Sequence, residues 1–276
     1  MMCAWKQLLS VLPPEISEQA ASVGKEALQE LRLRVNAPPE LITSGGSVWP
    51  TERVVEKADL DFVMNAASRY SPWCAGTMAR GYLTAPGGHR IGICGEGFEA
   101  EEGACGFRSI RSLCIRVAKD FPGLAQKAAG AEGSILIVGA PGWGKTTLLR
   151  DLARQISRKQ TVCVVDERGE LFPEGLERGK RMDVLTGIGK ARGMDMVLRT
   201  MSPMCIAVDE ITAQSDCIGL LQAANCGVRL IATAHAGSGE DLKSRALYRT
   251  LLENNVFQTR LQLHADKSYR VERMAL

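Results

Sequence analysis

The 276-residue sequence predicts an α/β protein in which a smaller α+β domain, residues 1–120, precedes a domain with a parallel sheet, residues 134–276. In the second part, short and wholly apolar runs alternate with helical stretches, which is typical of a parallel sheet covered by helices on both faces. The first part instead contains strand-like runs in which apolar and polar residues alternate. Segment 121–133, rich in Gly and Ala, is expected to be a linker between the two.

The composition is that of an ordinary globular protein, with 45% apolar and 24% charged residues. A net charge of +3 permits an acidic partner but does not by itself indicate nucleic acid. The nine cysteines include no Cys-x-x-Cys pair and only three histidines accompany them, so reduced thiols are expected. No apolar run approaches the roughly 20 residues that span a bilayer. We therefore expect a cytoplasmic protein without a signal peptide, held at any membrane by other proteins.

Four segments of the first part have recognisable local patterns. Residues 31–35 (LRLRV) and 112–119 (SLCIRVAK) alternate apolar and polar side chains, which predicts strands with one buried face. Residues 59–68 place apolar side chains at helical spacing. Residues 81–95 contain two β-rich runs around Pro86-Gly87-Gly88, the pattern of a hairpin.

The predicted strands of the second part end at glycine or polar residues. They are the runs ILIV (135–138), VCVV (162–165), CIAV (205–208) and LIAT (230–233). Since ligands of open α/β sheets bind beyond the carboxyl ends of the strands, chemistry is expected at these endings. Near the C-terminus, residues 256–264 and 269–274 have the pattern of a closing hairpin.

The first ending carries the pattern Gly139-x-x-x-x-Gly144-Lys145-Thr146 and opens a stretch with one apolar helical face. A strand, a glycine loop and a helix in this order form a phosphate-binding loop. Glycines let backbone N–H groups turn toward the phosphates, and the helix N-terminus adds partial positive charge. Lys145 is expected to bridge the β- and γ-phosphates of ATP, and Thr146 to place its hydroxyl on Mg²⁺. The predicted nucleotide-binding loop comprises Gly139, Ala140, Pro141, Gly142, Trp143, Gly144, Lys145, Thr146 and Thr147.

Two side chains of this loop have other expected places. Thr147 is expected beside Thr146, toward the α-phosphate. Trp143 puts a large ring where such a loop is usually small. The sequence leaves open whether that ring packs on a neighbouring residue or on the base.

A second ending, Asp209-Glu210 after the run CIAV, supplies a pair of carboxylates. Asp209 is expected to bind Mg²⁺ through water, and Glu210 to orient and polarise the attacking water. A glutamate directly after the magnesium-binding aspartate favours hydrolysis over transfer of phosphate to a small molecule. The alternative is a solvated strand end, which the phosphate loop upstream makes the weaker interpretation. The two endings together predict a RecA-like P-loop ATPase domain that uses ATP and Mg²⁺.

Polar groups also follow the other two strands. Asp166 and Glu167 are predicted to sense the γ-phosphate, with an exposed turn as the alternative. His235 is predicted to do the same, with a helix-cap or core histidine as the alternative. Residues 177–199 form a basic segment, and most of its charges are expected to be solvated. Arg199 is the residue of this segment that we expect to take part in catalysis. These basic residues are Arg178, Lys180, Arg181, Lys190, Arg192 and Arg199.

In this order, the segments GAPGWGKTT, VVDERGEL, LRTMSPMCIAVDEIT and ATAHA resemble the motifs of the secretion ATPases of type II and type IV systems. Within that superfamily the sequence more closely resembles the stage III sporulation protein AA group of endospore-forming bacteria. The segments LRLRVNAPPELI, GYLTAPGGHRIGICGEG, SLCIRVAK, MDVLTGIGKARGMDMVLRTMSP and IAVDEIT carry this likeness. It covers most of the chain and is loose before Leu31. Secretion ATPases usually have Gly-Glu where this chain has Asp209-Glu210, as the sporulation group does.

The resemblance assigns roles to single residues. It implies that Asp166 and Glu167 form an acidic box, that His235 belongs to a histidine box, and that Arg199 is the arginine preceding the Walker B strand. The resemblance also implies a hexameric ring in which the N-terminal domain contributes arginines to the nucleotide site. Arg90 and Arg116 are the matching candidates.

The resemblance implies a place in the cell as well. Such a protein works on the mother-cell side of a channel between mother cell and forespore, attached through integral membrane proteins. A ring-forming ATPase motor is therefore the main hypothesis. A nucleotide-dependent scaffold without turnover and a nucleic-acid-stimulated ATPase are the alternatives. The last is disfavoured because the sequence has 5% aromatic residues and no interleaving of basic and aromatic residues.

Overall fold

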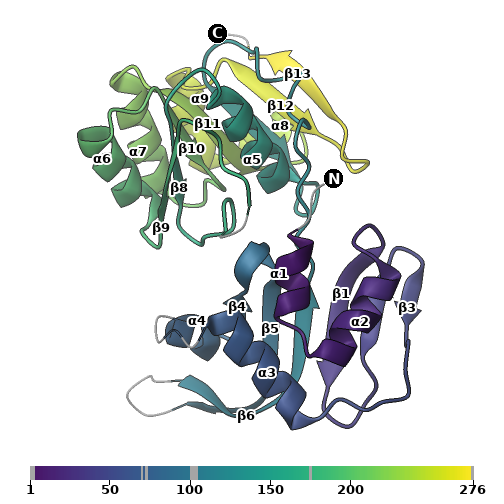
Figure 1. Cartoon of the computed structure of the whole chain (residues 1–276). Helices are drawn as coiled ribbons and strands as arrows, with labels where there is room; N and C mark the ends of the chain where they lie inside the picture. The colour runs from purple at the N-terminus through teal and green to yellow at the C-terminus, as the bar shows by residue number, and fades with distance from the viewer. Residues whose placement is uncertain (1–3, 70, 72–73, 100–104, 174–175, 275–276) are drawn as a thin grey trace. The chain divides into compact units, whose positions relative to one another are not determined.

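Each half of the chain is built on a sheet of its own (Figure 1). The computed structural model describes residues 4–69, 71, 74–99, 105–173 and 176–274. Contacts divide the chain into a first unit, up to Asp120 with Pro173–Leu176, and a second unit, Phe121–Phe172 with Glu177 onward. Within the described residues, no helix is long and apolar enough to cross a membrane.

The first unit consists of an antiparallel sheet with strand order β3-β2-β1-β6-β5-β4 and helices packed on its apolar side chains. Its helices are α1 (Trp5–Ser10), α2 (Pro14–Val23), α3 (Lys57–Ser68) and α4 (Ala75–Ala79). Its strands are β1 (Leu28–Arg34), β2 (Glu40–Thr43), β3 (Gly46–Val48), β4 (Tyr82–Thr84), β5 (Arg90–Glu99) and β6 (Cys105–Arg116). The strand, helix and hairpin predicted from the local patterns are present as β1, α3 and β4–β5, and segment 112–119 falls mostly within β6.

Alternation along the strands decides which face of this sheet is buried. Leu31 and Leu33 of β1 pack with Ile91 of β5 and Ile115 of β6 in one apolar cluster, together with side chains of α1, α2 and α3. The residues between them in sequence point to the opposite face because successive side chains of a strand alternate. Arg90 and Arg116 lie on that opposite face, as direct register partners in the β5–β6 ladder.

The second unit has a mostly parallel sheet with strand order β13-β12-β7-β11-β10-β8-β9. Its strands are β7 (Ile135–Gly139), β8 (Val162–Asp166), β9 (Met182–Thr186), β10 (Cys205–Val208), β11 (Arg229–His235), β12 (Thr259–Leu263) and β13 (Tyr269–Arg273). Its helices are α5 (Lys145–Ile156), α6 (Lys190–Thr200), α7 (Gln214–Asn225), α8 (Gly239–Ser244) and α9 (Arg249–Glu253). The four apolar runs are β7, β8, β10 and β11, and the C-terminal hairpin is β12–β13, as predicted. Edge strand β9 was not predicted, since it lies within the basic segment.

Both faces of the central strands are covered, which explains why β7, β8 and β10 are buried along their whole length. Along β7, Leu136 and Val138 belong to a cluster with side chains of α6 and α7. Ile135 and Ile137 belong to another cluster with the apolar side of α5. The central strand β7 therefore buries side chains in both directions and has no polar face, whereas the edge strands β9 and β13 carry exposed residues.

Segment 121–133 is part of the second unit and not the linker that the sequence suggested. Ala125 and Ala128 are fully buried in the cluster around α5. The carboxylate of Asp151 on α5 accepts hydrogen bonds from the backbone N–H groups of Gly123 (3.1 Å) and Ala125 (2.8 Å). Small side chains that looked like linker composition are there because this segment packs closely on the helix.

The described cysteines are free thiols. Burial raises the pKa of Cys163 to about 11 and that of Cys205 to about 12. Because the reactive thiolate is disfavoured at neutral pH, these two side chains act as core packing.

Candidate active site

Strand order brings the predicted site together. The phosphate-loop strand β7 pairs with β11, and β11 pairs in turn with β10, all parallel. In this register His235 lies opposite Gly139, and Val208 lies opposite Ala232. The carboxyl ends of the three strands therefore meet at one edge of the sheet, with the end of β11 between the phosphate loop and the two carboxylates.

The phosphate loop has the backbone that its glycines allow. Gly142 and Gly144 have φ of +78° and +100°, in the left-handed region that other residues rarely adopt. A Cβ at Gly139 would lie 3.0 Å from the Cβ of Leu263 and 3.5 Å from the Trp143 ring, so glycine permits a close approach there. Trp143 packs on the apolar cluster around α5, which answers where its ring lies in this structure. Pro141 and Gly142 are exposed at the tip of the loop.

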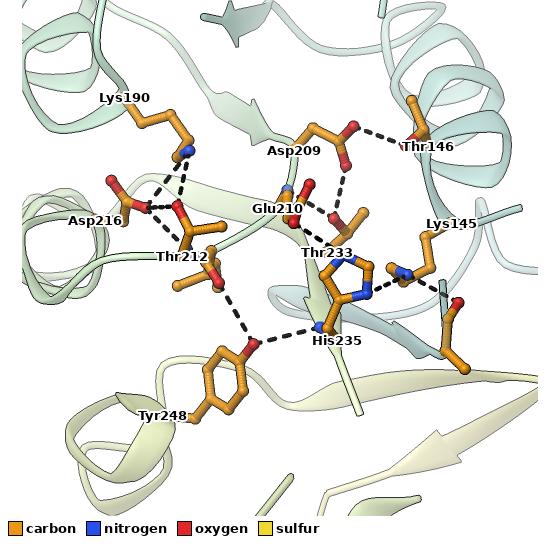
Figure 2. A network of polar contacts seen from close by, with 12 residues as sticks. Lys145, Thr146, Lys190, Asp209, Glu210, Thr212, Asp216, Thr233, His235 and Tyr248 are labelled. Carbon is orange, nitrogen blue, oxygen red and sulfur yellow. Dashed lines mark hydrogen bonds and ion pairs between the residues drawn. The ribbon is translucent and has the colours of Figure 1, made fainter. Parts of the chain in front are cut away.

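Lys145, the first residue of α5, is buried with its ammonium facing the strand ends. Its Nζ donates to the carbonyl oxygen of Ala140 at 3.0 Å and lies 2.9 Å from Nδ1 of His235 (Figure 2). Burial lowers the pKa of Lys145, and the carboxylates of Asp209 and Glu210 oppose that shift. The ammonium of Lys145 thus has two neutral hydrogen-bond partners. An anion at the same position would bind it more strongly.

His235 links this lysine to Glu210, which follows β10. Its Nε2 lies 2.9 Å from Oε1 of Glu210 (Figure 2). An ammonium offers only donors, so Nδ1 must accept from Lys145, and the ring proton then lies on Nε2 and is donated to Glu210. The result is a hydrogen-bonded chain from Lys145 through His235 to Glu210.

The oxygen atoms of Asp209 and Thr146 lie close together at the strand ends. Thr146 Oγ1 donates to Asp209 Oδ2 at 2.8 Å, and Thr233 Oγ1 donates to Asp209 Oδ1 at 2.6 Å (Figure 2). Mg²⁺ prefers oxygen ligands and is usually held by one or two carboxylates together with substrate phosphates. The hydroxyl and carboxylate present here fit that donor set. Thr147, the next residue of α5, is half-buried.

Glu210 has an unusual backbone. Its φ is +50°, in the left-handed region, which costs a residue other than glycine about 1 kcal/mol or more. The hydroxyl of Thr233 accepts the Glu210 N–H at 2.7 Å, and the Thr233 carbonyl accepts the Ile211 N–H at 3.0 Å. Because Thr233 and His235 are two residues apart on β11, they face the same side, and one strand positions both carboxylates.

Asp166 is not available as the sequence predicted. Its side chain is buried, and its carboxylate accepts the backbone N–H groups of Glu170 (3.0 Å), Leu171 (2.8 Å) and Phe172 (3.3 Å). Its carboxylate therefore holds the turn after β8. Glu167 is exposed and forms an ion pair with Lys190 at 3.2 Å.

Arg199 is also not where the prediction placed it. Its side chain is 76% exposed and paired with Asp195 one turn earlier on α6. Helix α6 contacts the turn after β8 that carries Glu167 (the acidic turn) through Lys190, its first residue. Arg199 is nine residues later in the helix and therefore lies about 14 Å further along its axis. Within this chain, Arg199 does not contribute to the site.

The two arginines of the first unit are described within that unit only. Arg90 lies over the ring of Tyr82, 4.8 Å from its centroid, and Arg116 is 3.6 Å from Glu30. Their placement side by side on one sheet face was not foreseen. Their role at a nucleotide remains a prediction.

Two residues with structural roles at the site were missed in the sequence. Lys190 was taken for a solvated charge of the basic segment, although its side chain is only 11% exposed. Tyr248 is buried, donates to the carbonyl oxygen of Ile211 at 3.4 Å and accepts the His235 N–H at 3.3 Å. A lysine at the first position of a helix was a usable signal, since the helix dipole disfavours a cation there. No local sequence pattern indicated that Tyr248 would lie at the site.

The chain has the fold of the secretion and pilus ATPases. It is similar to the Legionella pneumophila ATPase DotB, with a TM-score of 0.60 and 19% identity over 94% of this chain and 78% of that chain. It is similar to the pilus retraction motor PilT with bound ADP, with a TM-score of 0.63 and 13% identity over 93% of this chain and 80% of that chain. At these identities the likeness concerns the fold alone.

The family follows from the sequence comparison. Residues 6–272 match the family model described as sporulation stage III, protein AA. The chain is 34% identical over 281 residues to the stage III sporulation protein AA of Bacillus subtilis (strain 168), covering 95% of this chain and 91% of that protein. The chain therefore belongs to the stage III sporulation protein AA family.

Proposed function

We propose that this protein is a Mg²⁺-dependent ATPase whose site is the strand-end cluster around Lys145, Thr146, Asp209, Glu210 and His235. The observation that carries the proposal is the chain Lys145–His235–Glu210, which connects the phosphate-binding lysine to the water-activating glutamate. A loop that only held phosphate would need no connection to a second carboxylate. The fold that the chain shares with the ATPase DotB supports this proposal.

Each residue of the proposed site has its own role in binding or hydrolysis. Lys145 exchanges Ala140 and His235 for phosphate oxygens, because a charge-assisted contact is stronger than either neutral one. Thr146 and Asp209 hold Mg²⁺, which neutralises charge on the phosphates. Glu210 accepts the proton of the attacking water. When Lys145 leaves His235, Nδ1 loses its donor, so binding of the phosphates is communicated to Glu210 through one ring.

At the level of the assembly, we propose a homo-oligomeric ring, a hexamer, that drives a channel between mother cell and forespore. Membership of the sporulation family supports the setting, and the fold shared with a retraction motor supports the ring. Integral membrane proteins of the channel complex attach the ring at the mother-cell side. Arg90 and Arg116 are the proposed residues that the first unit offers to a nucleotide.

Hydrolysis and oligomeric mass of the purified protein test the proposal. We expect Mg²⁺-dependent turnover in the wild type and its loss in Lys145→Ala. Glu210→Gln should lower turnover by roughly 10²- to 10⁴-fold with little change in ATP binding, since it removes the proton acceptor and no phosphate contact. ATP-dependent hexamers should accumulate in that variant.

A monomer that binds nucleotide tightly without turnover, even with its membrane partners, would contradict the motor and favour a nucleotide-dependent scaffold. Hydrolysis stimulated by single-stranded nucleic acid and lost at high salt would favour the other alternative.

A further inference from the structure

Lys190 joins three segments that are separate in sequence. Its Nζ lies 3.2 Å from Oε2 of Glu167 on the acidic turn and 3.3 Å from Oγ1 of Thr212. It also lies 3.6 Å from Oδ2 of Asp216 in the first turn of α7. Figure 2 shows Lys190, Thr212 and Asp216 converging beside the strand end that carries Asp209 and Glu210.

Asp216, the partner of Lys190, fixes the loop that follows Glu210. Its Oδ2 accepts the backbone N–H groups of Thr212 (3.0 Å) and Ala213 (3.1 Å) and the Thr212 hydroxyl (3.3 Å). Thr212 is only two residues beyond Glu210. The contacts of Lys190 and Asp216 with Thr212 therefore hold one end of the segment whose other end is held by Thr233 at the Glu210 N–H.

The left-handed backbone of Glu210 needs such anchors. A non-glycine residue keeps a positive φ only when its surroundings determine the conformation. Tyr248, in the short 3₁₀ helix η3 (Ala246–Tyr248), and Thr233 on β11 anchor this segment from one side. Lys190 is the contact that ties it to the turn after β8. Without Lys190, the segment that carries Glu210 loses its contact with the turn after β8.

The charges around Lys190 also support a role beside Glu210. Lys190 lines a small pocket together with Glu167, Asp209 and Glu210. A cation at the N-terminus of α6 opposes the helix dipole, so its position serves the carboxylates around it and not the helix. Its ammonium lies near the carboxylates of Glu167 and Asp216 and screens their mutual repulsion beside this pocket.

We propose that Lys190 is a positioning residue that acts through Glu210: it ties the acidic turn to the Thr212–Asp216 loop and so sets the orientation of the Glu210 carboxylate toward water. This inference rests on the proposed ATPase function. It assigns Lys190 no contact with the nucleotide. Its removal should therefore change turnover and not affinity.

The first test compares Lys190→Met with Lys190→Arg and the control Lys243→Met, an exposed lysine on α8, in the full chain. We expect Lys190→Met to lower kcat about 10- to 100-fold, within the range of contributions from acid–base groups, and to leave the Kd for ADP within about threefold. Lys190→Arg should recover much of the rate, and Lys243→Met should match the wild type. Wild-type kcat in Lys190→Met, or an affinity that falls as much as kcat, would overturn the proposal.

The second test combines Lys190→Met with Glu210→Gln and measures single-turnover rates. If Lys190 acts only through Glu210, the double variant should be no slower than Glu210→Gln alone, because residues acting as a unit are not additive. If the rate loss of the double variant equals the product of the losses in the two single variants, Lys190 acts independently of Glu210 or is merely structural, and the proposal is overturned. If Lys190→Met melts at lower temperature, Glu167→Gln removes the same tie from the other side and should show the same non-additivity. Absence of hydrolysis in both the wild type and Lys243→Met would instead overturn the ATPase function itself.

Discussion

Thr146 Oγ1 donates a hydrogen bond of 2.8 Å to Oδ2 of Asp209, which joins the first turn of α5 to the end of β10. The two residues are 63 positions apart in the sequence. Their oxygens meet because β10 and β7 both pair with β11. This contact is the structural basis for the proposed magnesium site.

Thr146→Ala should therefore raise the Mg²⁺ concentration needed for half-maximal hydrolysis by at least about tenfold, a loss typical of altered metal sites. The reason is that the variant removes one oxygen donor and leaves Asp209 in place. Thr146→Ser keeps the hydroxyl and should stay within about threefold of the wild type. A Mg²⁺ titration of ATP hydrolysis distinguishes them, and equal Mg²⁺ requirements in Ala and wild type would count against Thr146 as a ligand.

His89 predicts a pH dependence of stability in the first unit. It is fully buried, its Nε2 lies 3.0 Å from the Ala4 carbonyl oxygen, and its Nδ1 accepts the Ala118 N–H at 3.1 Å. Burial lowers the pKa of His89 below its ordinary value of 6.5, and the contact with Ala4 opposes the shift. The unfolded chain thus binds a proton that the folded chain rejects once the pH falls below 6.5, so stability is lost as the pH falls and is complete above that value.

Urea unfolding of the wild type between pH 7.5 and 5.5 should show this loss, at up to about 1.4 kcal/mol per pH unit below pH 6.5. His89→Gln lacks the titrating ring and should have a flatter profile over the same range. Parallel profiles of the two proteins would show that His89 is not the group responsible.

Asp151 predicts a large loss of stability on a conservative change. It is fully buried on α5, where it accepts two backbone N–H groups of segment 121–133 and lies 3.1 Å from Nη1 of Arg154. Asp151→Asn should lower the free energy of unfolding by about 3 kcal/mol, because it leaves a buried arginine with a weaker partner. Asp195→Asn removes an exposed ion pair on α6 and should change it by less than about 1 kcal/mol. Chemical denaturation measures both, and similar losses would contradict the anchoring role of Asp151.

Much of the candidate site could be predicted because its motifs are local. The residues 139–147 show a strand ending, a glycine pattern and a helical face within one short stretch, and the structure has all of them. Asp209, Glu210 and His235 follow directly on apolar runs and therefore lie at strand ends. For such residues a strand prediction already places the side chain at the correct edge of the sheet.

Other residues were misjudged where a long-range contact decides the role. Asp166 also follows a strand, but the turn 170–172 folds back and takes up its carboxylate. Arg199 is near Asp209 in sequence, but the length of α6 separates it from the acidic turn. Segment 121–133 has the composition of a linker, and only its contact with Asp151 shows that it packs on α5.

By itself, the sequence determined the residue types at the strand ends, the phosphate loop and the alternation that buries each sheet, since these depend on neighbours along the chain. Only the tertiary structure decided that β11 lies between β7 and β10, and so that His235 contacts both Lys145 and Glu210. It also decided that Lys190 and Tyr248 reach the loop after Glu210. The physical reason is that strand order follows from how helices cross over and pack on the sheet, which no local pattern records.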